Sequence, residues 1–204
     1  MNSQTSDKLY LLNKYKLAIF ASGRGSNAEK IIDHFKNSET VSIDLIVTNK
    51  EKAMVLDLAK KNAIPQFVIA NKKTFTTSNS LIETLQEKGI THIILAGFLW
   101  LIPTNLINAY PNRIINIHPA LLPKYGGKGM YGMNVHKAVK ANREVETGIT
   151  IHLVNERYDD GKHLSQQRCE LTSSDSAEQI AKKVLGLEHY HYPRVIEKYL
   201  AESS

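Results

Sequence analysis

Asn116 and His118 are the residues of this chain whose types and spacing are best suited to chemistry. They follow the apolar pair Ile114-Ile115, which predicts the end of a buried strand, and one residue separates them. Residues i and i+2 of a strand point to the same face, so an amide donor and an imidazole would lie side by side. Pro119 and Pro123 would stiffen the exit of this strand, because proline fixes φ. A polar strand end that runs into a proline-rich turn explains these residues equally well.

A strand, a glycine-rich turn and a helix follow one another near the start of the chain. The apolar run Leu17–Ala21 predicts a strand buried on both faces, and Ile31, Ile32 and Phe35 have helical spacing. Between them, residues 22–27 read Ser-Gly-Arg-Gly-Ser-Asn. Glycines let backbone N–H groups approach a phosphate, and the dipole of a helix N-terminus favours an anion. An ordinary turn between a strand and a helix is the alternative.

The same turn matches the dinucleotide-binding pattern Gly-x-Gly-x-x-Ala, starting at Gly23. The nicotinamide version of that site needs an acidic residue at the tip of the second strand, about 20 residues on. The second strand is predicted over Ile43–Val47, its tip reads Thr48-Asn49-Lys50, and Asp44 lies at its other end. We therefore interpret the turn as a site for a monophosphate.

Strand-like and helix-like segments alternate along the remaining chain. This alternation predicts an α/β fold with a mostly parallel twisted sheet and helices on both faces. Ligands of such sheets bind beyond the carboxyl ends of the strands. The glycine-rich turn, the segment 97–100 and Asn116 with His118 all directly follow predicted strands, so we expect one site. The last helical segment is predicted to start with a capping-box-like Asp175–Glu178 and to run to Leu200 with a break near Pro193. The further predicted strands are 66–69, 93–96, 148–154 and 164–171, and the further predicted helices are 54–61, 81–88, 103–109 and 135–139.

Composition limits the class of protein. The chain has 204 residues, 42% hydrophobic content, a net charge of +6 and one cysteine, Cys169. These values predict one globular domain over residues 16–204 after a loose arm at 1–15, in a reducing cytoplasm. There is no apolar run of about 18 residues and no signal-peptide pattern, so we expect no membrane partner. The lysines are scattered without interleaved aromatics, so we expect no nucleic-acid partner. His189 and His191 lie two apart on a helix and are poor co-ligands, so we expect no metal.

Four stretches together carry a resemblance to a known family. The chain resembles the folate-dependent phosphoribosylglycinamide formyltransferases over nearly everything from Lys16 to Leu200. The Asn-x-His-Pro motif with a later Asp-x-Gly is typical of folate formyltransferases, and the Ser-Gly-x-Gly-Ser-Asn turn favours the glycinamide branch. Methionyl-tRNA formyltransferases look similar around His118 but carry a further C-terminal domain, which we do not expect here. The four stretches are residues 21–27, residues 95–98, residues 116–123, and the region that begins with 148–150 and ends with 158–161.

The resemblance implies a Rossmann-like formyltransferase fold with an antiparallel C-terminal strand. It also implies two small-molecule substrates, glycinamide ribonucleotide as acceptor and 10-formyltetrahydrofolate as donor, in purine biosynthesis. The phosphate would bind at Gly25, Ser26 and Asn27, and Glu188 would bind the ribose hydroxyls. The folate would bind near Lys72 and near Leu99, Trp100, Leu101 and Ile102. The enzyme would be a monomer or a homodimer.

Several residues depart from the family pattern. Trp100 stands where the family often has arginine, and Lys162-His163 replaces apolar residues after Asp-x-Gly. The glycine-rich loop at 126–133 is longer than is usual and lacks a histidine pair, keeping only His136 nearby. This loop is long enough to act as a lid, and a tolerated surface loop is nearly as good an interpretation.

Formyl transfer sets requirements that Asn116, His118 and Asp159 can meet. An amine attacks an N-formyl carbon, negative charge grows on the formyl oxygen, and a proton must leave the amine. Asn116 offers a neutral amide donor to that oxygen, a contribution of roughly 3–4 kcal/mol in other acyl-transfer systems. His118 can donate to the oxygen or carry the proton, because an imidazole titrates near neutral pH. Asp159 would favour the charged imidazole or bind a water that relays the proton.

Four other functions fit parts of the sequence. A formyltetrahydrofolate hydrolase transfers the formyl group to water with a similar site, although such enzymes usually carry an additional N-terminal domain. A formyltransferase with another amine acceptor is a further alternative. A nucleotide-binding module without formyl chemistry would need the missing acid on the second strand. A nucleic-acid binder is supported by net charge alone.

Overall fold

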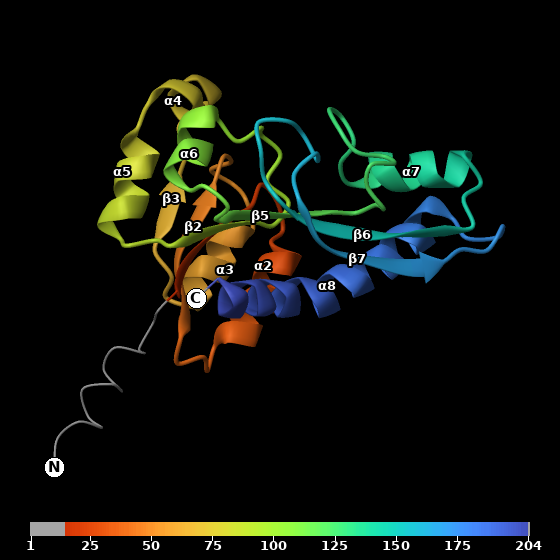
Figure 1. Cartoon of the computed structure of the whole chain (residues 1–204), viewed down its shortest axis with the longest axis horizontal. Coiled ribbons are helices and arrows are strands. Elements are labelled where there is room, and N and C mark those ends of the chain that lie inside the picture. Colours follow the sequence, from red (N-terminus) through yellow and green to blue (C-terminus); the bar gives the residue numbers. More distant parts are fainter. Residues whose placement is uncertain (1–14, 204) are drawn as a thin grey trace, which may run out of the picture. The chain divides into compact units, whose positions relative to one another are not determined.

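The computed structural model describes residues 15–203 (Figure 1). The predicted N-terminal arm therefore lies outside the described residues, except for Tyr15, which opens the first strand. Seven strands have the sheet order β3-β2-β1-β4-β5-β6-β7. They are β1 (Tyr15–Phe20), β2 (Val41–Thr48), β3 (Gln66–Val68), β4 (His92–Leu95), β5 (Ile114–His118), β6 (Glu146–Leu153) and β7 (His163–Glu170).

The helices alternate with the strands as the sequence predicts, with one addition. The short helix α4 was not predicted. Its sequence, Lys-Lys-Thr-Phe-Thr-Thr, has little helix propensity, and the Asn71 side chain caps it by accepting from the backbone N–H of Thr74 at 2.9 Å. The helices are α2 (Ser26–Phe35), α3 (Val55–Lys61), α4 (Lys72–Thr77), α5 (Ser80–Glu87), α6 (Thr104–Ala109), α7 (Met133–Ala141) and α8 (Ala177–Glu202).

The described residues divide into two compact units, 15–98 with 108–113, and 99–107 with 114–203. In the first unit β1 pairs in parallel with β2 and β4, and β2 with β3. The chain moves outward from β1 to β3 and then returns to β4, so right-handed crossovers place α2 and α3 on one face and α5 on the other. The point of reversal lies between β1 and β4, where ligands of such sheets bind. The predicted parallel α/β arrangement is confirmed here.

The second unit is an antiparallel three-stranded sheet with one long helix. β6 runs antiparallel to both β5 and β7. Figure 1 shows α8 extending along β6 and β7, and α8 contacts all three strands. The Tyr192 hydroxyl, on the buried face of α8, donates to the Ile115 carbonyl at 3.0 Å. This bond fixes the helix against the strand that carries Asn116 and His118.

Two expectations for α8 were wrong in detail. The helix continues through Pro193, because buried residues on both sides of the proline, including Val184 and Ile196, keep one continuous face packed. The capping box is formed by Ser176 and Gln179, one residue later than predicted. The Asp175 carboxylate instead accepts from the backbone of Thr172 and from Lys183. A single folding domain over residues 16–204 stays a prediction.

Candidate active site

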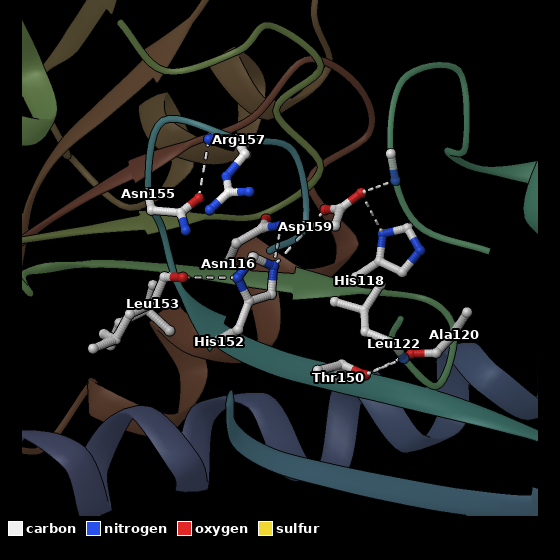
Figure 2. A network of polar contacts seen from close by, with 12 residues as sticks. Asn116, His118, Ala120, Leu122, Thr150, His152, Leu153, Asn155, Arg157 and Asp159 are labelled. Atoms are coloured by element: carbon white, nitrogen blue, oxygen red, sulfur yellow. Dashed lines mark hydrogen bonds and ion pairs between the residues drawn. The ribbon is translucent and has the colours of Figure 1, made fainter. Parts of the chain in front are cut away.

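The pairing of β5 with β6 assembles the candidate site. Asn116 lies opposite His152 and His118 lies opposite Thr150. Alternate residues of a strand share a face, so all four side chains point to the same side of the sheet. Figure 2 shows this cluster, with Asp159 approaching from the loop after β6. The predicted side-by-side placement of Asn116 and His118 is confirmed, although both lie within the strand.

Asn116 is oriented by His152, a buried residue that is 2% exposed. His152 Nδ1 lies 2.8 Å from the carbonyl oxygen of Leu153, so this nitrogen carries the proton and donates it. Its Nε2 then accepts from Asn116 Nδ2 at 3.1 Å. Burial lowers the pKa of His152 despite the nearby Asp159 carboxylate, which keeps the ring neutral and Nε2 an acceptor. One amide hydrogen of Asn116 is thereby fixed, and the second is left to donate to a substrate.

Asp159 lies on the loop between β6 and β7 in a left-handed conformation, with φ of 54°. Aspartate tolerates this region better than most residues. Its Oδ2 accepts from the backbone N–H of Gly127 at 2.9 Å and lies 3.4 Å from His118 Nδ1. Burial alone would raise the pKa of Asp159, but the His118 and Gly127 hydrogen bonds and the nearby His152 outweigh it and lower the pKa. Asp159 is therefore a carboxylate at neutral pH.

His118 is held between two acceptors. Its Nε2 lies 2.8 Å from the carbonyl oxygen of Tyr125, and its Nδ1 faces Asp159. A carbonyl oxygen can only accept, so Nε2 carries a proton and donates it to Tyr125. His118 is 3% exposed. The side chain is thus fixed at both nitrogens beside the carboxylate.

Thr150 secures the proline-rich turn after β5. Its hydroxyl donates to the Ala120 carbonyl at 2.7 Å and accepts from the backbone N–H of Leu122 at 3.0 Å (Figure 2). The Gln166 amide donates both to this hydroxyl and to the Leu122 carbonyl, at 2.9 Å each. The turn that leads from His118 is therefore held by side chains of β6 and β7.

The glycine-rich turn lies in the first unit, between β1 and α2. Gly25 has φ of 78° and stands at the N-cap of α2 without a side-chain cap. A Cβ on Gly25 would approach Val55 Cγ2 to 2.8 Å, so glycine is needed for space as well as for conformation. The backbone N–H of Ser22 donates to the Gly97 carbonyl at 3.1 Å, which joins the turns after β1 and β4. This geometry presents the N-terminal amides of a ten-residue helix.

The tip of β2 carries no acidic side chain. Asn49 lies there and its Oδ1 accepts from the Ser22 hydroxyl at 2.7 Å. Asp44 lies within β2 and faces Lys16 at 3.8 Å. The acid that a nicotinamide site requires is therefore missing from this position, as the sequence indicates.

Three further groups of predicted residues occupy separate elements. Glu188 lies on the buried face of α8, 9% exposed, four residues before Tyr192. Lys72 is the exposed first residue of α4 in the first unit. The segment Leu99–Ile102 follows β4 outside any helix or strand, with Ile102 buried and Leu99 exposed.

His152 and Thr150 are site residues that the sequence reasoning missed. The signal was present, because the predicted strand 148–154 alternates and places both residues on one face. Which face would meet Asn116 depends on the pairing register, and sequence does not show it. The backbone contributions of Tyr125 and Gly127 had no signal at all. The candidate site thus holds one neutral N–H donor and one carboxylate, both beside His152.

Residues 15–203 also bear on a metal site and on a membrane span. No three histidine, cysteine, aspartate or glutamate side chains of this range gather closely enough to hold a metal ion. None of the helices in it is long and apolar enough to cross a membrane.

A mostly parallel α/β sheet with this Asn-His-Asp cluster defines the class of protein. The chain belongs to the formyl transferase family, which it matches over residues 15–196. It is 42% identical over 186 residues to the chloroplastic phosphoribosylglycinamide formyltransferase of Arabidopsis thaliana, covering 89% of this chain and 64% of the relative. It is 37% identical over 191 residues to the Bacillus subtilis phosphoribosylglycinamide formyltransferase, covering 91% of this chain and 94% of the relative.

Solved structures agree with these relatives. The crystal structure of the Bacillus halodurans phosphoribosylglycinamide formyltransferase superimposes with a TM-score of 0.83 at 32% identity, covering 93% of this chain and 97% of that one. The formyltransferase fold is therefore confirmed. The chain spans only 64% and 62% of the two plant relatives that it matches, from Arabidopsis thaliana and Vigna unguiculata.

Proposed function

We propose that the chain transfers a formyl group from 10-formyltetrahydrofolate to the amine of glycinamide ribonucleotide in purine biosynthesis. Relatives from plants and bacteria carry the name phosphoribosylglycinamide formyltransferase. The Bacillus subtilis relative is matched over nearly its whole length, which supports carrying over the activity.

The chemistry follows from the two free polar atoms of the cluster. The amine nitrogen attacks the formyl carbon and forms the new C–N bond, while negative charge grows on the formyl oxygen. Asn116 donates its second amide hydrogen to that oxygen. Asp159 takes the proton that leaves the amine, directly or through a water, and passes it to the folate nitrogen as the bond from the formyl carbon to that nitrogen breaks and the formyl C=O forms again.

One observation supports this assignment above all others. His152 Nε2 lies 3.1 Å from Asn116 Nδ2 and 3.8 Å from Asp159 Oδ1. The proposed donor and the proposed acceptor therefore both lie within 4 Å of the same buried nitrogen atom. Asp159 Oδ2 is occupied by Gly127, which leaves Oδ1 to meet the proton. His118 Nδ1, 3.4 Å from Oδ2, helps to keep the carboxylate in place.

The substrates need anchors besides the reacting atoms. We assign the ribonucleotide phosphate to Gly25, Ser26 and Asn27, because the N-terminus of α2 has no side-chain cap to satisfy its amides. Glu188 is assigned to the ribose hydroxyls. Lys72 and the segment Leu99–Ile102 are assigned to the folate by the family resemblance. The phosphate anchor and the Asn-His-Asp cluster belong to different units and are tested by different variants.

Compartment and assembly are part of the same proposal. A cytoplasmic location is supported by the free thiol of Cys169. The plant relatives are named chloroplastic, so targeting differs among relatives. A monomer or a homodimer is expected, and light scattering after gel filtration decides between them.

The deciding experiment follows 10-formyltetrahydrofolate by absorbance with and without glycinamide ribonucleotide. Deformylation that requires the ribonucleotide supports the proposal. Equal consumption without it would indicate a hydrolase, and activity with other amines would indicate another acceptor. Asn116→Ala should lower kcat by about 100-fold or more while the protein stays folded, since one oxyanion donor is worth that much elsewhere. Near-normal turnover of this variant would overturn the role of Asn116.

A further inference from the structure

Tyr125 connects the candidate site to a side-chain pair outside it. Its carbonyl oxygen is the acceptor for His118 Nε2, while its hydroxyl donates to Glu144 Oε1 at 2.8 Å. Glu144 stands in the turn between α7 and β6, where its backbone N–H bonds to the Val139 carbonyl. A phenol–carboxylate bond therefore ties the residue that holds His118 to a well-anchored turn.

The backbone at Tyr125 is in an unfavourable conformation. Its φ is 57°, a left-handed value that bulky residues seldom adopt. The chain then passes through Gly126 to Gly127, whose N–H binds Asp159. A Cβ on Gly126 would approach Leu122 Cδ2 to 2.6 Å and Asp159 Cβ to 3.3 Å. Residues 125–127 thus present a carbonyl to the histidine and an N–H to the aspartate from one tightly packed stretch.

The Glu144 carboxylate is suited to hold this stretch. Oε1 also accepts from Lys124 Nζ at 3.0 Å, and the Glu144 side chain is 22% exposed. The Lys124 hydrogen bond, and then that of Tyr125, lower the pKa of Glu144, so it is charged at neutral pH. Burial and the bond to Glu144 raise the pKa of Tyr125 to about 12, so the phenol carries its proton and is the donor.

We propose that the Tyr125–Glu144 hydrogen bond is a positioning device for His118 and Asp159. The bond holds Tyr125 in its left-handed conformation, and this conformation directs the carbonyl at His118 Nε2 and the Gly127 N–H at Asp159 Oδ2. Neither Tyr125 nor Glu144 touches a reacting atom in this scheme. The proposal rests on the proposed formyl transfer, because it makes His118 and Asp159 the residues that are positioned.

The central variant is Tyr125→Phe, which removes one hydroxyl and keeps the ring. We expect kcat to fall by about tenfold or more, because small misplacements of catalytic groups cost up to ~100-fold. KM for both substrates should stay within about twofold, since no substrate contact is lost. Glu144→Leu should reproduce this loss, and Glu144→Gln should retain most of kcat because its amide oxygen still accepts the phenol proton.

Two controls separate positioning from general destabilisation. Lys124→Met removes the other partner of Glu144 Oε1 from a side chain that is 67% exposed, and it should leave kcat within about twofold. The double variant Tyr125→Phe/Glu144→Leu should be no slower than either single variant, because both break the same bond. Multiplying losses, or a wild-type kcat for Tyr125→Phe, would overturn the proposal.

A spectroscopic readout distinguishes this proposal from the proposed function. Nitrogen NMR of histidine-labelled protein, with His118 assigned through a His118→Gln variant, reports the proton on Nε2. We expect the hydrogen-bonded Nε2–H signal of the parent protein to shift, and its exchange with water to quicken, in Tyr125→Phe. If the His118 signal changes in Tyr125→Phe but the parent protein has no formyl transfer activity, the proposed function is refuted and the positioning role of Tyr125 stands. An unchanged signal would refute the positioning whatever the activity.

Discussion

Replacing Asp159 by asparagine tests the proposed proton acceptor with the smallest structural change. Asparagine has the same shape and tolerates the left-handed φ of 54° as well as aspartate does. Its side-chain oxygen can still accept from the Gly127 N–H, so the loop should keep its place. The side chain loses its charge and its ability to take a proton. A positioned general base contributes typically 10²–10⁴-fold, so kcat should fall by that factor, roughly 3–5 kcal/mol of activation free energy.

The neighbouring Asp160 supplies a matched control. Its carboxylate accepts from Asn155 at 3.1 Å and pairs with Arg157 at 3.1 Å, and its side chain is 46% exposed. Asp160→Asn makes the same chemical change one residue along the loop and should keep kcat within about twofold. Both variants are assayed by ribonucleotide-dependent formyl transfer under saturating substrates. A kcat of Asp159→Asn within tenfold of the parent, or an equal loss in both variants, would refute the assignment of the proton acceptor.

Three further predictions concern the residues that support the site and the fold. Thr150→Val leaves three polar partners without the hydroxyl, two of them buried, so the free energy of unfolding in urea should fall by about 3 kcal/mol. A loss under 1 kcal/mol would contradict the role of this residue. His92 is 5% exposed, and burial, aided by Arg113, lowers its pKa from 6.5 to about 4. The unfolded chain therefore binds a proton that the folded chain does not, and stability of about 3 kcal/mol is lost as the pH falls from 6.5 to 4. His92→Gln should flatten the pH dependence of unfolding over this range, and an unchanged slope would refute it. Gly25→Ala should raise KM for the ribonucleotide and lower stability by about 1–2 kcal/mol, because Val55 and the left-handed backbone oppose a side chain; an unchanged KM would argue against the phosphate site.

The elements of the fold were largely predictable from periodicity. The buried run before the glycine-rich turn, the helical spacing after it and the alternation over residues 148–154 all correspond to elements of the structure. The failures have local causes. α4 depends on one asparagine cap rather than on an apolar pattern, and α8 crosses Pro193 because tertiary packing outweighs the cost of a proline.

The candidate site was predictable only where chemistry is carried by a motif. Asn116 and His118 stand out by type and spacing, and Asp159 stands out once a resemblance supplies the motif. No sequence motif singles out His152, because its role follows from which residue of β6 lies opposite Asn116. Backbone partners such as the Tyr125 carbonyl cannot be read from side-chain types.

The cross-strand register of β5 and β6 has a consequence for how this sequence can vary. Asn116 meets His152 and His118 meets Thr150 only in one alignment of the two strands. A single-residue deletion within β6 would turn its side chains to the opposite face. Asn116 would then lose its acceptor His152, and the turn after β5 would lose its hydrogen bonds to Thr150. A substitution on the other face of β6, where Ile149 and Ile151 are buried, changes packing but leaves the alignment intact. Chain length within β6 is therefore constrained more strictly than the identity of any one residue on its other face, and related sequences should differ there by replacement and not by insertion or deletion.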